Sequence, residues 1–373
     1  MQGDAGAQRD AGPPVSDAGA VAGRDGSATT ATLVSRPAAC AASDDGERPA
    51  GTDSFTPNTG KRAVSAITYA NVGAAGAYAE VVDGWSKATG CQGDDSAGTF
   101  CKTRYRQSKH VDGPLAPFYE EQTLVFAGPI ELYRIGIYAP EGGGWRRSAY
   151  WDRCTTDGLA FAGNKHWYEC GGFVESYVRS DGTKESAAPL QFAGSVAAGV
   201  KVHVNASTLC AAGECDYATG LPLHGFAGDG EGSKLFAVTL RMPFGASTPA
   251  FWVLPTQVIR ANQYGCNCRG MGSDPTYKGG CGELDVAEVL GGVTTSLEAT
   301  STLYSFQDIT GGGDVTFARP VRETATFVLL YDAPSRSIGI RRLAGGALDF
   351  TTTLDAARIA TLLAEAGTVR TLK

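Results

Sequence analysis

The 373-residue chain lacks the features that would mark a membrane-spanning, collagen-like or zinc-finger protein. No apolar run approaches the roughly 18 residues that a membrane helix needs. The 17 prolines and 50 glycines follow no Gly-X-Y period, which excludes a collagen helix. The ten cysteines include no C-x-x-C pair, the usual knuckle of a zinc module, so we expect no metal centre of that kind.

The chain also lacks any concentration of charge of one sign. Its 32 Lys and Arg residues and 39 Asp and Glu residues give a net charge of −7, and both signs are interspersed. Nucleic acids and anionic membranes bind basic stripes or patches. We therefore expect no nucleic-acid partner and no membrane-spanning segment.

Aromatic residues are missing from the N-terminal segment before Phe55, which consists mainly of Ala, Gly, Asp, Ser and Pro. Such a segment buries too little apolar surface to offset the entropy cost of ordering it. We expect residues 1–62 to be a disordered tether, or merely a disordered tail. A tether fits a secreted or cell-surface protein whose signal peptide or lipid anchor is absent from this chain.

Cysteine is present in an even number, in a chain with only three methionines. Cysteines that lie close together in sequence favour disulfides in an oxidising compartment, although their connectivity does not follow from the sequence. The disulfide candidates are Cys91, Cys101, Cys154, Cys170, Cys210, Cys215, Cys266, Cys268 and Cys281.

Short runs of aliphatic and aromatic residues, separated by Gly, Asp, Pro or Asn, recur from about residue 63 onward. Strands at this spacing predict an all-β fold, an antiparallel β-sandwich. One helix is expected near the C-terminus, with Thr353 as its N-cap and Ile359 and Leu362 on an apolar stripe that packs on the outside of a sheet. The predicted strands are 124–139, broken at Gly128-Pro129, and 199–204, 235–242, 250–253, 283–290, 325–331 and 337–342.

The most informative segment is 280–290, which contains an E-x-D-x-x-E pattern. Residues two apart in a strand share a face, so Glu283 and Asp285 point to the same side. Glu288 would fall on the opposite side in a regular strand. One β-bulge near Val286 and Ala287 would return it to the side of the other two acids.

Three acids on one strand face repel one another, and glycoside hydrolysis gives a reason to gather them. That reaction needs one carboxylate to attack the sugar C1 and another to protonate the leaving oxygen, and a third acid between them separates their pKa values. Two other interpretations remain open. The acids could form an exposed edge strand that discourages aggregation, or a calcium site.

Aromatic and histidine residues supply the candidate substrate-binding groups. The run 249–255, PAFWVLP, predicts a strand on which Phe251 and Trp252 face opposite sides, and either ring could pack in a core or form a floor for sugar stacking. The predicted substrate-binding residues are Trp252, Tyr264, His224 and Trp145.

PAFWVLP followed by GELDVAE resembles the pairing found in glycoside hydrolase family 16, the clan of laminarinases and lichenases. A longer resemblance links the chain to the Target-of-SBF-like glycoside hydrolases of fungal cell walls. It is carried by ITYANVGAAGAY (67–78), LAPFYEEQTLVFAGPIELYRIGIYAP (115–140), LPLHGFAGDGEGSKLFAVTLRMP (221–243), QYGCNCRG (263–270) and GCGELDVAEVL (280–290).

The resemblance implies a concanavalin-like jelly roll and a retaining, endo-acting enzyme for a β-linked glucan, with Glu283 as nucleophile, Asp285 as its assistant and Glu288 as general acid/base. We divide the chain into the tether 1–62, an N-terminal glycine-rich β module 63–140 and a catalytic domain 141–373. A disulfide between Cys281 and either Cys266 or Cys268 would clamp the loop that leads into the acidic strand.

The function predicted from the sequence is hydrolysis or transglycosylation of a β-glucan, most of all a β-1,3-glucan, by a monomer. No organic cofactor is expected, although a structural calcium ion is compatible with the sequence. The alternative is a non-catalytic lectin-like or cell-wall structural protein on the same fold. Sequence alone does not separate hydrolase from transglycosylase.

Overall fold

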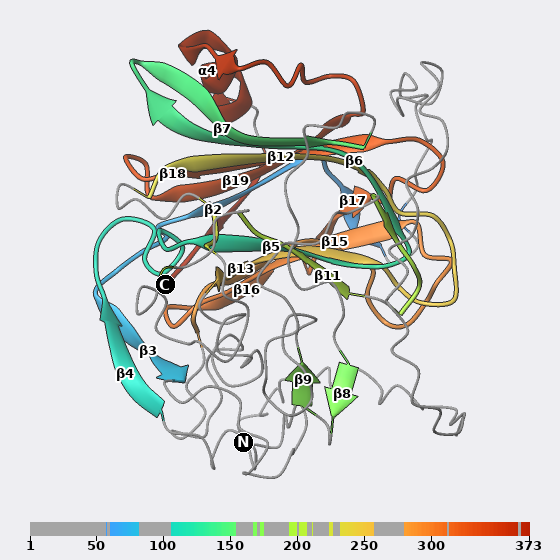
Figure 1. Cartoon of the computed structure of the whole chain (residues 1–373), viewed down its shortest axis with the longest axis horizontal. Coiled ribbons are helices and arrows are strands. Elements are labelled where there is room, and N and C mark those ends of the chain that lie inside the picture. The colour runs from blue at the N-terminus through green and yellow to red at the C-terminus, as the bar shows by residue number, and fades with distance from the viewer. Residues whose placement is uncertain are drawn as a thin grey trace, which may run out of the picture.

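Two large β-sheets stack face to face, and one helix lies on the outer side of one of them (Figure 1). The computed structural model describes residues 57, 60–81, 106–153, 167–169, 172–174, 194–199, 201–206, 211, 224–226, 232–256, 280–311, 313–364 and 367–373. Within them the prediction of an all-β sandwich is confirmed. Each strand run predicted from the sequence lies in one of the two large sheets, and the run 124–139 divides into two strands at Gly128-Pro129.

The first large sheet has eight strands and carries the predicted acidic strand near its middle. In spatial order it comprises β1 (Arg62–Ala63), β17 (Val315–Ala318), β15 (Glu298–Tyr304), β14 (Glu283–Glu288), β13 (Ala250–Pro255), β5 (Gln122–Ala127) and β11 (Lys201–Val204), with β16 (Ile309–Gly311) paired to β15. All of these pairs are antiparallel except β1 with β17.

The second large sheet has nine strands and covers the other side of the core. Strands β2 (Ala66–Ala70) and β21 (Thr368–Thr371) pair in parallel, which brings the segments near the two ends of the described chain side by side. The spatial order is β20 (Thr353–Leu354), β7 (Gly144–Asp152), β6 (Ile130–Glu141), β12 (Lys234–Arg241), β18 (Ala325–Asp332), β19 (Ser337–Ala344), β2 (Ala66–Ala70) and β21 (Thr368–Thr371), with β10 (Ser195–Val196) paired to β6.

Apolar side chains fill the space between the sheets and also cover the outer face of each. The central cluster includes Phe126 and Phe251, whose rings stack with their centroids 4.8 Å apart. A second cluster on the outer face of the eight-stranded sheet contains Trp252 together with Tyr78 and Val111. These last two residues belong to a hairpin of β3 (Gly76–Val81) and β4 (Arg106–Val111). A second hairpin, β8 (Trp167–Glu169) with β9 (Gly172–Val174), lies on the same side of the sandwich (Figure 1).

The C-terminal helix α4 (Ala356–Ala364) packs on the outside of the nine-stranded sheet, as predicted, through the buried Ile359 and Leu362. Its N-cap was predicted wrongly. Thr353 lies in β20, paired with Arg146, and the side chain of Asp355 accepts a hydrogen bond of 2.6 Å from the backbone N–H of Arg358. Asp355 has the capping role because the extended backbone of β20 reaches Leu354.

Strands from the segment 63–140 lie in both large sheets. β5 lies between β13 and β11, and β6 lies between β7 and β12. Each large sheet therefore contains strands from before and from after residue 140, the boundary expected from the sequence. Of the expected tether 1–62, only residues 57 and 60–62 are among the described residues. No helix in the described ranges is long and apolar enough to cross a membrane.

Candidate active site

The acidic strand β14 is entered through the turn Gly280-Cys281-Gly282. Both glycines have positive φ angles, +102° and +105°, which a residue with a side chain rarely adopts. A Cβ at Gly280 would also lie 2.4 Å from the backbone nitrogen of Phe306. Cys281 between them is fully buried and disulfide-bonded. This turn is therefore packed closely against the backbone of Phe306 at the point where the acidic strand begins.

A bulge in β14 follows directly from the pairing of its neighbours. On β13, Phe251 pairs with Ala287 and the next residue, Trp252, pairs with Asp285, so Val286 has no partner there. On the other side, Asp285 and Glu288 pair with Thr302 and Thr300 of β15, so two acids that are three positions apart have partners only two positions apart. The predicted bulge at 286–287 is therefore confirmed.

The bulge brings the three acids to one face of the sheet. Leu284, Val286 and Ala287 all belong to the central cluster between the sheets. Because two successive residues, Val286 and Ala287, both face the core, the alternation shifts by one residue and Glu288 returns to the outer side with Glu283 and Asp285. Glu283 and Asp285 are buried, at 0% and 4% exposed, whereas Glu288 is partly exposed.

Trp252 lies on the same outer face, beside Asp285. Phe251 belongs to the central cluster and Trp252 to the outer one, so these neighbours face opposite sides as predicted. The strand pairings continue this outer row across the sheet in the order His203, Val125, Trp252, Asp285, Thr302 and Gly311. His203, only 2% exposed, was not singled out from the sequence. The alternation in KVHV predicts that His203 faces away from its valine neighbours, but it does not reveal that β11 joins the acidic sheet.

A buried hydrogen-bond chain reaches the bulge from the core side. The Ser301 hydroxyl on β15 donates a hydrogen bond of 2.6 Å to the backbone carbonyl of Asp285, and lies 2.8 Å from the Tyr69 hydroxyl on β2. Since Ser301 uses its proton on the carbonyl, Tyr69 is the donor to Ser301. Burial holds the pKa of Tyr69 above its usual value, which keeps this donor protonated. The two hydroxyls connect the nine-stranded sheet to the bulged backbone between the acids, a link that strand patterns alone do not reveal.

The spacing of the acids sets a geometric requirement. Glu283 and Glu288 pair with Tyr304 and Thr300, four residues apart on β15, so their backbones are separated by about 13 Å. Retaining glycoside hydrolysis needs carboxyl groups about 5 Å apart. The two side chains would have to lean toward each other across Asp285 to meet that value.

The other predicted binding residues lie in different places. The His224 Nδ1 is 2.8 Å from a Glu121 carboxylate oxygen, and the second oxygen of Glu121 accepts a hydrogen bond from the backbone N–H of Gly225. Glu121 directly precedes β5, so this pair is near one end of the acidic sheet. Trp145 is on β7 in the nine-stranded sheet, apart from the acids. Tyr264 is outside the described residues.

The described residues include one of the candidate cysteines and all three acids. Among the described residues, no three His, Cys, Asp or Glu side chains are grouped so that they could hold a metal ion. Glu283, Asp285 and Glu288 are among the residues covered by this statement. Cys281 is the one disulfide candidate within the described ranges. The partner of Cys281, expected to be Cys266 or Cys268, and the pairing of the other candidates stay predictions.

The architecture makes this chain an all-β sandwich protein with an acid-bearing, bulged strand on one outer face. Two family models match it, described as the N-terminal and C-terminal parts of the cell wall protein YJL171C/Tos1, over residues 65–140 and 143–362. The chain therefore belongs to the YJL171C/Tos1 family of cell wall proteins, which confirms the fungal cell-wall resemblance.

Curated relatives carry the name "Probable circularly permuted 1,3-beta-glucanase". TOS1 of Saccharomyces cerevisiae is 29% identical over 221 residues, covering 53% of this chain and 45% of the relative. TOS1 of Candida albicans is 27% identical over 257 residues, covering 62% and 52%, and PGA52 of the same species is 26% identical over 278 residues, covering 65% and 67%. The chain thus spans about half the length of the first relatives it matches. No solved structure matches it.

Proposed function

We propose that this chain is a retaining, endo-acting hydrolase or transglycosylase of a β-linked glucan, with β-1,3-glucan as the preferred substrate. The observation that carries the proposal is the bulge in β14, which gathers Glu283, Asp285 and Glu288 on one face beside Trp252. The substrate class is supported by the names of the relatives, which are called 1,3-beta-glucanases.

The proposed mechanism assigns one step to each acid. Glu283 attacks C1 of the sugar while Glu288 gives its proton to the departing glycosidic oxygen, which leaves a glycosyl ester on Glu283. Glu288, now a carboxylate, removes a proton from water or from a sugar hydroxyl that attacks C1 and releases Glu283. Asp285 lies between them on the same face and would hydrogen-bond the nucleophile. The relation to glycoside hydrolase family 16 belongs to this proposal.

Burial of the acids limits how a substrate can approach. Glu288 is partly exposed and can exchange protons with water, as a general acid/base must. Glu283 is fully buried, so a sugar ring reaches its carboxylate only after the outer face of β14 is uncovered. Tyr78 and Val111 of the β3–β4 hairpin pack in the same outer cluster as Trp252, which makes this hairpin a part of the cover that would have to move.

The same burial favours a second candidate, a non-catalytic glucan-binding or cell-wall structural protein. A carboxylate that stays inaccessible cannot attack a sugar, and the fold would then present its surface to the polysaccharide without cleaving it. In both cases the partner is a β-glucan and the location is the cell surface, in keeping with the family's description as cell wall proteins. The enzyme is proposed to act as a monomer. It needs no organic cofactor, because the two carboxylates supply the nucleophile and the proton.

The test begins with digestion of a panel of glucans that differ in linkage, read by product size and by the anomeric configuration of the first products. Internal cleavage with retention is expected for β-1,3-glucan. Glu283→Gln should lower turnover by at least about a thousandfold while oligosaccharide binding persists, because the side chain keeps its size but loses its nucleophilic oxygen. Glu131→Gln is the control, since Glu131 is paired with Arg241 on the other sheet.

The roles of the two glutamates are separated by rescue with azide. With a substrate whose leaving group needs no proton, Glu288→Ala should still form the glycosyl ester, and azide should then release a β-glycosyl azide. A β-azide from Glu283→Ala together with an α-azide from Glu288→Ala would reverse the assignment. Full activity in Glu283→Gln would refute the site, and glucan binding without cleavage by the unaltered protein would favour the non-catalytic candidate.

A further inference from the structure

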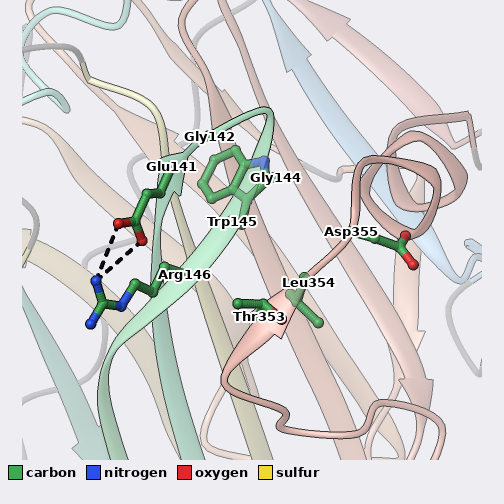
Figure 2. Close-up of a pocket in the computed structure, with 8 residues that line it drawn as sticks. All are labelled: Glu141, Gly142, Gly144, Trp145, Arg146, Thr353, Leu354 and Asp355. Carbon is green, nitrogen blue, oxygen red and sulfur yellow. Dashed lines mark hydrogen bonds and ion pairs between the residues drawn. The ribbon is translucent and has the colours of Figure 1, made fainter.

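A cavity of about 340 Å³ lies at the edge of the nine-stranded sheet. Its walls are the tip of the β6–β7 hairpin, strand β20 and the residue that caps helix α4 (Figure 2). The acids belong to the eight-stranded sheet and face outward from it, so the cavity and the acids are on different sheets of the sandwich. The cavity is therefore separate from the candidate active site.

The walls of this cavity are fixed by backbone pairing. Glu141 pairs with Gly144 across a two-residue turn, Gly142-Gly143, whose φ angles of +58° and +85° suit the tight hairpin turn that glycine favours. Trp145 and Arg146 then pair with Leu354 and Thr353 of β20. A site built on paired strands is preorganised, which lowers the entropy cost of binding.

The lining combines one aromatic ring with both acidic and basic side chains. Trp145 is partly exposed and packs against the cluster under helix α4. Figure 2 shows its indole beside the turn, with the Glu141–Arg146 ion pair of 3.1 Å on one side and Thr353, Leu354 and Asp355 across from it. The side chains of Glu141 and Arg146 are 54% and 64% exposed, so they can bind a ligand without first being uncovered.

This set of groups selects a ligand class. Two carboxylates, on Glu141 and Asp355, oppose binding of an anion such as a phosphate, and the arginine beside them opposes binding of a cation. Trp145 and Leu354 are too few to hold a purely apolar ligand. A neutral molecule with a flat apolar face and many hydroxyl groups satisfies both the ring and the charged groups, and a sugar has that chemistry.

We propose that the cavity at Trp145 is a second carbohydrate-binding site, which holds a segment of a β-glucan chain away from the acids. The sugar face would stack on the Trp145 indole. Arg146 alternates with Trp145 along β7, so its ion pair with Glu141 is on the other face of the hairpin, and these two side chains would hydrogen-bond hydroxyls of a further sugar unit where the glucan chain passes the sheet edge. The choice of β-glucan as ligand rests on the proposed function, whereas the site itself rests on the cavity and its lining. Because the two sites are on different sheets, only a long or particulate glucan can engage both, and its retention is strengthened by the second contact.

The test is retention of the full chain on insoluble β-1,3-glucan particles, measured with Glu283→Gln as the background so that the particles are not digested. Adding Trp145→Ala should weaken retention about tenfold, the size expected for a central aromatic contact. In the active protein, Trp145→Ala should leave turnover of a short soluble oligosaccharide unchanged. Tyr150→Ala is the matched control, since Tyr150 is on the same strand and packs against the same cluster but does not line the cavity.

A second variant guards against loss of folding. Glu141→Gln with Arg146→Gln removes the exposed ion pair without touching the packed cluster, and it should weaken retention severalfold at an unchanged melting temperature. Retention equal to that of the background in both the Trp145 variant and this double variant would overturn the proposal, as would an equal loss in Tyr150→Ala. If the unaltered protein cleaves no glucan and Trp145→Ala still weakens retention, the proposed function fails and the second site stands.

Discussion

Ser301→Ala should weaken both the stability of the sandwich and the geometry of the bulge. Ser301 receives a hydrogen bond from Tyr69 and donates one to the Asp285 carbonyl. Its hydroxyl is therefore the centre of a buried chain between two sheets, and both Tyr69 and Ser301 are fully buried. Removing it leaves the Tyr69 hydroxyl without an acceptor and takes a donor from the bulged backbone.

The magnitude follows from the cost of stranding buried polar groups. One unsatisfied buried donor costs about 1–3 kcal/mol, and a typical intramolecular hydrogen bond contributes about 1 kcal/mol net. Ser301→Ala should therefore lower the free energy of unfolding by about 2–3 kcal/mol, and Tyr69→Phe by about 1 kcal/mol. The double variant should lose only about 2 kcal/mol, because Tyr69→Phe removes the hydroxyl that Ser301→Ala strands. The coupling between the two positions is then about 1–2 kcal/mol.

The assay is urea unfolding of the four proteins, followed by fluorescence and by circular dichroism so that coincident transitions establish a two-state process. If the enzyme proposal holds, turnover of Ser301→Ala should also fall about ten- to a hundredfold, since a shift of about 1 Å in the bulge misplaces Glu288 relative to Glu283. A double variant whose loss equals the sum of the two single losses would refute the hydrogen-bond chain.

Two further predictions concern pH and redox state. Burial raises the pKa of Tyr133, Tyr138 and Tyr150 to about 12, whereas an unfolded tyrosine titrates near 10, so the folded protein keeps protons that the unfolded chain loses. The free energy of unfolding should then be unaffected by these groups below pH 10 and fall as the pH rises from 10 to about 12. Full tyrosinate absorbance, that of all 14 tyrosines, near pH 10 in the folded protein would contradict this. Thiol titration of unfolded, non-reduced protein should find almost none of the ten cysteines free, and reduction should lower the melting temperature; five or more free thiols would refute an oxidised, exported protein.

The sequence by itself determined the fold class, the strands and the face of each acid. Alternation of apolar and other residues is a local property of a strand, so Phe251 and Trp252 could be assigned to opposite faces before any pairing was known. The E-x-D-x-x-E spacing likewise predicted the bulge, because Glu283, Asp285 and Glu288 share a face only with one extra residue between them. The apolar stripe of Ile359 and Leu362 predicted the packing of the helix for the same local reason.

Only the tertiary structure decided which strands are neighbours. His203 and Trp145 both follow recognisable patterns in the sequence, yet one lies in the row of Asp285 and the other at a cavity on the opposite sheet. The link from Tyr69 through Ser301 to Asp285 joins positions 232 and 16 residues apart. Alternation specifies the face that a side chain occupies, but strand pairing depends on packing across the whole core, and contacts between distant segments therefore leave no periodic signal in the sequence.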